Sequence, residues 1–357
     1  MSKGCRWKSG FLFKVESMTI DELKKNYDVV NFVEGSIPIP KKPESGLVLI
    51  KGSSGSGKTT ILKSWTNAGN VQFDNTKSVI ENFSSIENGD ELLRAFGLKS
   101  IPTWFRPYHT LSNGEAHRAF CALSVDHKVE CIDEFTSTVD RNTAMSLSVA
   151  LRKWVSNQLL IVASCHIDIE EWLCPDHIYD ADRQEWQQRR YLRRPPISLS
   201  ITVGDFKDWV LFKKHHYLTG DVSKSCHFYL ARYKDTPVAF LAVIHRCSRD
   251  IPSYWGESRI VVLPEFQGLG IGVALSEAIA EFYTDNGLRY FAKTSHPSLG
   301  LYRNKSSKWR PTSTNMVKRT SYLQKDGTPR KQNGFGKTEK QILRDVGRVC
   351  YSHEYIG

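Results

Sequence analysis

Long apolar segments are missing from this chain of 357 residues. No run of about 18 apolar residues could cross a bilayer, and the N-terminal MSKGCRWKSG has no apolar stretch followed by a small-residue cleavage site. We therefore expect a cytoplasmic protein without a membrane partner. Internal repeats are missing as well, which argues against an array of similar modules.

Clustered cysteines are also missing. The eight cysteines are scattered, with no CxxC pair and no Cys/His group at zinc-finger spacing. Several lie in apolar runs, where cysteine behaves as a small buried hydrophobe. This pattern excludes a disulfide-stapled or zinc-stapled fold and favours reduced thiols.

Apolar material is sufficient for real cores, at 40% hydrophobic and 24% charged residues, and the length suggests two or three domains. The formal net charge is +11, but it is unevenly distributed. Residues 1–182 carry a net charge of −3, residues 183–300 carry +5 and residues 301–357 carry +9. The basic excess lies in the C-terminal half, which predicts that this half meets a polyanion, in particular nucleic acid.

The order of apolar runs predicts an α/β domain followed by an α+β domain. Residues 46–50, 128–132 and 159–164 are short apolar runs with helix-like segments between them, which indicates a parallel sheet. Residues 227–233 and 237–244 flank a short turn, and a further strand and an amphipathic helix follow. We expect domains at residues 1–184 and 198–312, a basic, Pro-containing linker at 185–197 and a basic extension at 313–357.

The segment GSSGSGKT at residues 52–59 follows a predicted strand and precedes a predicted helix, and it fits the P-loop pattern GxxxxGK[ST]. Glycines allow backbone amides to curl around phosphates, the lysine reaches the β- and γ-phosphates, and the threonine hydroxyl binds Mg²⁺. An accidental Gly/Ser-rich loop is the alternative. The residues that we expect to bind ATP here are Gly52, Ser53, Gly55, Gly57, Lys58, Thr59 and Thr60.

The segment VECIDE, residues 129–134, is an apolar strand that ends in two acids. Asp133 is expected to hold Mg²⁺, and Glu134 to polarise an attacking water. LSNGE (residues 111–115), TVD (138–140) and ASCH (163–166) follow the order of the signature, D-loop and switch histidine of ABC ATPases, and the chain resembles that family. The resemblance implies that Ser112 and Gly114 close on the nucleotide of a second copy, that His166 is catalytic, and that ATP drives a homodimer.

This resemblance to ABC ATPases has gaps. Only about 50 residues separate Thr60 from Leu111, too few for the helical subdomain of transporter ATPases. Gln72 is the only glutamine in that interval and lies closer to the P-loop than usual. Gln72 is carried over as a metal ligand on the resemblance alone.

QGLGIG, residues 267–272, matches the pattern Q/R-x-x-G-x-G/A after a predicted strand and before a predicted helix. This arrangement resembles the acyl-CoA loop of GNAT acetyltransferases, in which backbone amides at a helix N-terminus hold the CoA diphosphate. The resemblance implies an α+β GNAT domain that binds acetyl-CoA or another acyl-CoA. The implied ligand-binding residues are Gln267, Gly268, Gly270 and Gly272.

The sequence indicates the acid and the base of acyl transfer less clearly than the CoA-binding loop. Tyr302, in LYRN, resembles the tyrosine that protonates the CoA sulfur in GNAT enzymes, although a packing role is also open. Glu257, beside the central strand, is a candidate base, as are His215 and His216.

The whole chain resembles fusions of an ABC-type ATPase with a predicted acetyltransferase. The resemblance leads to an ATP-hydrolysing, acyl-CoA-dependent N-acyltransferase that acts on nucleic acid, with Tyr322, Phe335 and Tyr351 of the basic C-terminus available for base stacking. Two alternatives remain: an ATPase with a GNAT-like binding module, and an acetyltransferase for protein lysines or small amines.

Overall fold

The computed structural model describes residues 37–66, 71–155, 158–216, 221–248, 251–318 and 349–357, together with Cys5–Arg6, Leu12–Phe13, Thr19 and Lys25. Met1–Pro40 and Lys41–Gly357 are two units by their internal contacts. In the first unit, β1 (Cys5–Arg6) pairs antiparallel with β2 (Leu12–Phe13). The first predicted domain, residues 1–184, is therefore divided near Lys41, because the first 40 residues form a unit of their own.

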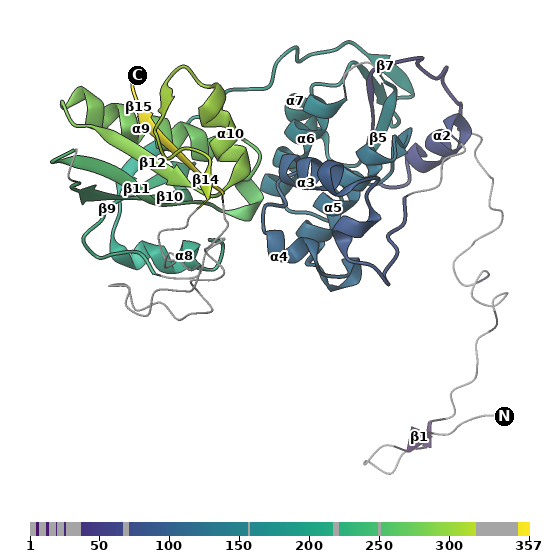
Figure 1. Ribbon diagram of the computed structural model, residues 1–357. Helices are drawn as coiled ribbons and strands as arrows, with labels where there is room; N and C mark the ends of the chain where they lie inside the picture. The colour runs from purple at the N-terminus through teal and green to yellow at the C-terminus, as the bar shows by residue number, and fades with distance from the viewer. Residues whose placement is uncertain are drawn as a thin grey trace. The chain divides into compact units, whose positions relative to one another are not determined.

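A five-stranded sheet organises the first domain of Lys41–Gly357, in the order β4-β5-β3-β6-β7 (Figure 1). Four of its strands are parallel, and β7 runs antiparallel to β6. The buried runs predicted from the sequence are its inner strands. Its strands are β3 (Leu47–Lys51), β4 (Cys131–Ile132), β5 (Leu160–Ser164), β6 (His177–Asp180) and β7 (Glu185–Gln187).

Helices and short turns surround this sheet. The helices are α2 (Lys58–Trp65), α3 (Ile86–Ala95), α4 (Ile101–Trp104), α5 (Asn113–Asp126), α6 (Arg141–Trp154) and α7 (Glu170–Leu173). The 3₁₀ turns are η1 (Val79–Asn82), η2 (Tyr108–Thr110) and η3 (Ile167–Ile169). Leu93, Leu123 and Leu147 pack with β3 and β5 in one apolar core.

Helix α6 is buried on all sides from Thr143 to Leu151. Leu147 and Leu151 belong to the core of the first domain, whereas Met145 and Val149 pack into the core of the second. A helix that is buried all round lies inside a larger core rather than on a surface. The two domains of Lys41–Gly357 therefore share one helix.

An eight-stranded sheet organises the second domain, in the order β13-β15-β12-β11-β10-β9-β8, with β14 also paired to β15. The strands are β8 (Ser200–Val203), β9 (His227–Tyr233), β10 (Thr236–Arg246), β11 (Tyr254–Val262), β12 (Tyr290–Thr294), β13 (Trp309–Pro311), β14 (Val317–Lys318) and β15 (Val349–Tyr355). Its other elements are η4 (Phe206–Asp208), α8 (Trp209–Lys213), η5 (Pro264–Phe266), α9 (Ile271–Asp285) and α10 (Pro297–Lys305). The predicted α+β class and the hairpin β9–β10 are present (Figure 1).

The last strand corrects the predicted boundary at residue 312. β15 pairs with both β12 and β13 inside the sheet, so residues 349–355 belong to the second domain and not to a basic extension. Tyr351 is buried, and a Cβ on Gly300 would lie within 2.0 Å of its ring. Tyr351 is therefore a packing residue and not a base-stacking one, while Tyr322 and Phe335 lie outside the described residues.

The first sheet ends with β7 and the second begins with β8, so the first three residues of the linker predicted at 185–197 lie in a strand of the first sheet. None of the helices in the described part of the chain has both the length and the apolar character that a membrane span requires.

Candidate functional site

The first glycine-rich loop, residues 52–59, joins the buried strand β3 to helix α2. Gly55 and Gly57 have φ angles of 83° and 92°, a left-handed conformation that favours glycine. Gly57 is the N-cap of α2, so the first amides of the helix border the loop. Such amides and the helix dipole attract phosphate oxygens. The local geometry fits the predicted phosphate site.

Lys58 and Thr59, the first two residues of α2, place a cation and a hydroxyl at this loop. The Lys58 Nζ donates hydrogen bonds to the carbonyl oxygens of Gly52, at 2.9 Å, and Ser53, at 2.6 Å. The Thr59 Oγ1 donates to the Asp133 Oδ2 at 2.7 Å. Mg²⁺ takes one or two protein oxygens and completes its shell with phosphates and water, so this hydroxyl and carboxylate fit that ion. No group of three or more His, Cys, Asp or Glu side chains forms a metal cage in the described part of the chain, so a cation here would need phosphate ligands.

The ends of three neighbouring parallel strands bring the remaining predicted groups to this edge. Asp133 and Glu134 follow β4, and His166 follows β5, which lies between β4 and β3. The Ser137 hydroxyl donates to the Glu134 carboxylate, and the His166 Nδ1 lies 3.2 Å from the Thr136 Oγ1. Partial burial, and then the nearby Arg141, lower the pKa of His166. A neutral imidazole is therefore favoured at this edge.

Asp182 is a further acid at the loop that no sequence pattern marked. Its Oδ2 accepts the Ser53 amide at 2.8 Å, and its Oδ1 accepts the Ser53 hydroxyl at 2.6 Å. These hydrogen bonds lower the pKa of Asp182. Asp182 follows β6, which pairs with β3 on the side opposite β5. Its role becomes visible only once the strand order is known.

The predicted signature segment forms the start of helix α5. Ser112 is the N-cap, and its side chain and that of Glu115 form a capping box. Ser112 is exposed, and apart from its chain neighbours and the backbone of its own helix no described atom lies within 4 Å of a Cβ built on Gly114. The segment therefore has room for a ligand or a second chain. Thr60 is exposed on α2, and Gln72 is exposed in the segment before η1; none of the described hydrogen bonds joins Gln72 to Thr59 or Asp133, so its metal role stays a prediction.

The second glycine-rich loop, residues 267–270, joins η5 to helix α9. Gly268 and Gly270 have φ angles of 90° and 87°, and Gly270 is the N-cap of α9. The Gln267 Nε2 donates to the Val262 carbonyl oxygen at 2.9 Å, which fixes the loop to the end of β11. A Cβ on Gly272 would lie 3.2 Å from the Val262 side chain, so glycine lets α9 approach that strand closely.

The strands beside this loop separate as they approach it. β11 and β12 are parallel and pair only at Trp255–Tyr290 and Gly256–Phe291. β11 then continues to Val262 and β12 to Thr294 without further pairing between the two, while β11 stays paired with β10 and β12 with β15. The backbone groups on the two edges that face each other have no ladder partner there and can accept an extended polar ligand that ends at the loop.

Glu257 lies inside the domain and not on this open edge. Its carboxylate accepts the Arg303 Nη2 at 3.1 and 2.9 Å and the Ser276 hydroxyl at 2.8 Å. Both ionic side chains are almost completely buried. This arrangement joins β11 to α9 and α10 and leaves no free carboxylate to remove a proton, so Glu257 has a structural role here in place of the predicted base role.

Tyr302 is partly exposed on α10, and its hydroxyl donates to the Glu277 Oε1 at 2.8 Å. Burial and Glu277 raise its pKa, so the phenol keeps its proton at neutral pH, as an acid must. No described hydrogen bond joins Tyr302 to the loop at 267–270. His215 lies just after α8, where burial and then Lys214 lower its pKa. The acid role of Tyr302 and the base role of His215 or His216 stay predictions.

Comparison with known proteins identifies the second domain. Residues 168–305 match the model of the Acetyltransferase (GNAT) family. No curated protein is a match. The sequence match begins before the end of the first sheet, which includes β6 and β7, so the sheet change marks the physical boundary.

Three solved structures illustrate the similarities. The ribosomal-protein-S18-alanine N-acetyltransferase of Escherichia coli is 13% identical, over 44% of this chain and 93% of that chain, with a TM-score of 0.29. Arabidopsis thaliana Naa50 in complex with a bisubstrate analogue is 14% identical, over 45% of this chain and 100% of that chain, with a TM-score of 0.31. The ATP-binding cassette MJ0796 bound to ADP and Pi is 17% identical, over 42% of this chain and 86% of that chain, with a TM-score of 0.33. These structures are too distant to establish a function, and the support for a GNAT acetyltransferase domain comes from the family match at residues 168–305.

Proposed function

We propose that this chain is an acetyl-CoA-dependent N-acetyltransferase whose first domain binds and hydrolyses ATP. The observation that carries the transferase part is the loop at residues 267–270, with two left-handed glycines and the N-terminus of α9, beside two strands that separate. The diphosphate of acetyl-CoA fits the helix amides. Its extended arm fits between the facing edges of β11 and β12, where the two strands no longer pair with each other.

The transfer step needs few protein groups. An acceptor nitrogen forms a bond to the thioester carbonyl carbon and gives its proton to a base, for which His215 and His216 are the candidates; the carbon–sulfur bond breaks, and the sulfur takes a proton from an acid. Tyr302 is the proposed donor of that proton, because its raised pKa keeps the hydroxyl protonated. Gln267, Gly268, Gly270 and Gly272 position the loop that receives the diphosphate.

Calorimetric titration of the full chain with acetyl-CoA tests this proposal. Gly270→Glu places a carboxylate in open space at the N-terminus of α9, where it repels phosphate, so we expect no measurable heat. Gly270→Asn is the matched control, because asparagine tolerates the left-handed conformation without adding charge. Absence of binding by the unmodified chain, or unchanged binding by Gly270→Glu, contradicts the proposal.

The ATPase part of the proposal relies on Lys58, Thr59, Asp133 and Glu134 at one sheet edge. Glu134→Gln removes the group that polarises water but keeps the loop and the cation ligands, so ATP should bind and persist. If Ser112 and Gly114 close on a second copy, this variant with ATP should be a dimer by light scattering. A Glu134→Gln protein that stays monomeric with saturating ATP contradicts the dimer.

Nucleic acid is the proposed acceptor, because the positive excess lies in the transferase half of the chain. Free-thiol release from acetyl-CoA should rise when DNA or RNA is added and should fall with salt. Mass spectrometry of nucleosides from cells with and without the protein then identifies the product. Stimulation by amines or proteins alone favours the small-amine or lysine acceptor, and binding without thiol release favours a binding module.

A further inference from the structure

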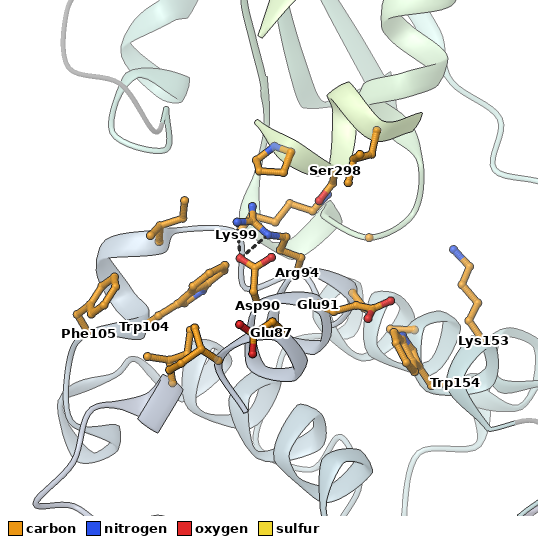
Figure 2. Close-up of a pocket in the computed structure, with 18 residues that line it drawn as sticks. Glu87, Asp90, Glu91, Arg94, Lys99, Trp104, Phe105, Lys153, Trp154 and Ser298 are labelled. Carbon is orange, nitrogen blue, oxygen red and sulfur yellow. Dashed lines mark hydrogen bonds and ion pairs between the residues drawn. The ribbon is translucent and has the colours of Figure 1, made fainter. Parts of the chain in front are cut away.

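A cavity of about 940 Å³ adjoins the second glycine-rich loop (Figure 2). One wall comes from the second domain and includes Gly268 and the first turns of α10. The other walls come from α3, α4 and the end of α6 in the first domain. A volume of this size is typical of small-molecule sites. The loop proposed to hold the CoA diphosphate thus opens toward residues of the nucleotide-binding domain.

The first domain touches the loop itself. A Cβ on Gly97 would lie 3.2 Å from the Gln267 carbonyl oxygen, and one on Gly268 would lie 3.5 Å from the Ala95 carbonyl oxygen. Arg118, on α5, donates to the Pro264 carbonyl oxygen at 3.0 Å and to the Phe96 carbonyl oxygen at 2.9 Å. These contacts fix the end of α3 and the segment after it against the loop.

Three cations line the cavity: Arg94, Lys99 and Lys153. Arg94 is paired with Asp90, and Glu87 and Glu91 are also lining residues. Lys99, by contrast, has no described hydrogen bond or ion pair with a carboxylate. Burial, followed by repulsion from Arg118 and Arg94, lowers its pKa to about 8, and no acid offsets these effects.

Aromatic side chains complete the first-domain wall. Trp104, Phe105 and Trp154 line the cavity, and Phe105 is 65% exposed. Figure 2 shows Lys99 beside Arg94 and below Ser298, with Trp104 and Phe105 on the same side of the cavity. A partly buried cation beside an exposed aromatic ring is a combination that binds a phosphorylated nucleoside, because the cation meets a phosphate and the ring can stack on a base.

We propose that residues 94–105 of the first domain complete the acetyl-CoA site, with Lys99 binding the 3′-phosphate of the CoA nucleotide and Phe105 facing its adenine. This proposal rests on the proposed function, because the diphosphate must lie at the loop of residues 267–270 for the 3′-phosphate to reach Lys99. It makes the transferase dependent on a side chain that the GNAT domain does not contain. It also gives Lys99 an anion, which none of the described carboxylates supplies.

The test compares acetyl-CoA with its 3′-dephospho form by calorimetry on the full chain. The unmodified chain should bind acetyl-CoA at least about tenfold more tightly than the dephospho form, since a buried charge-assisted contact is lost. Lys99→Gln should weaken acetyl-CoA binding by a similar factor and bring the two affinities close together. Lys207→Gln is the matched control, because Lys207 is exposed and outside the cavity.

The outcomes separate the two proposals. If the unmodified chain binds acetyl-CoA and Lys99→Gln keeps the same preference for the 3′-phosphate, this inference is wrong and the transferase proposal stands. If the unmodified chain does not bind acetyl-CoA, both are wrong. Thermal unfolding of each variant checks the fold, and adenosine 3′,5′-bisphosphate, which should bind the unmodified chain and not Lys99→Gln, provides a second readout that does not depend on the thioester.

Discussion

The two glycine-rich loops of this protein have the same backbone design and different charges. Gly55 and Gly57 in the first loop and Gly268 and Gly270 in the second are both spaced two residues apart with positive φ, and in both loops the second glycine caps a helix. The next residues are Lys58 and Thr59 in the first loop and Ile271 and Gly272 in the second. The backbone supplies amides in both cases, but only the first loop carries its own cation and hydroxyl.

This difference teaches that a phosphate loop and its cation need not come from one segment. In the first loop, Lys58 is a neighbour of the glycines along the sequence. In the second, Lys99 belongs to another domain and lines the same cavity as Gly268, because the segment that follows α3 packs against the loop. A sequence pattern therefore locates the first cation and misses the second.

The largest expected effect concerns Lys58, the cation that distinguishes the first loop from the second. Lys58→Ala should lower ATP hydrolysis by at least about 100-fold, because an oriented cation at the transferred phosphate is lost, while acetyl-CoA affinity should stay the same. Steady-state phosphate release and calorimetry measure the two. Lys63→Ala, on the exposed face of the same helix, is the control. An equal loss of acetyl-CoA binding would show that the loops do not act separately.

The second effect concerns the helix that follows each loop. Helix α9 is held by the buried Glu257–Arg303 pair through Ser276, whereas the buried side chains of α2 apart from Lys58 are apolar. Glu257→Gln leaves the Arg303 charge buried without its partner, so we expect a loss of about 3 kcal/mol of unfolding free energy in urea. Activity per folded molecule should be retained. Unchanged stability with lost turnover would instead identify Glu257 as the base.

A smaller effect appears with pH. Lys99 has a pKa near 8, lowered by burial and by the facing cations Arg118, Arg94 and Lys153, and Asp90 is paired with Arg94. Its charge is present below pH 8 and lost above it, so acetyl-CoA affinity should fall several-fold between pH 7 and pH 9.5. In Lys99→Gln, acetyl-CoA affinity should no longer fall over this pH range. A profile that is the same in both proteins contradicts the role of Lys99 in binding.

The smallest expected effect concerns the left-handed glycines, which both loops have. The space around a Cβ on Gly55 or Gly270 is open among the described atoms, so alanine meets only the strain of a left-handed backbone. Gly55→Ala and Gly270→Ala should each cost about 1 kcal/mol in urea unfolding. A much larger cost at one of them would mean that its glycine serves more than backbone geometry.

Local patterns predicted both loops, because strand, glycines and helix are contiguous in the sequence. The same applies to the strand ends that carry Asp133 and His166. β15 escaped prediction because its pairing partners β12 and β13 are distant in sequence. Glu257 was misinterpreted because its partner Arg303 lies 46 residues away, and only packing shows that the carboxylate is already occupied.

Helix α6 gives residues to both apolar cores of Lys41–Gly357. Cutting the chain at the predicted linker would leave the transferase half without Met145 and Val149 and expose apolar surface on each fragment. We therefore expect separately expressed halves to aggregate or to unfold, and the intact chain to melt in one cooperative transition.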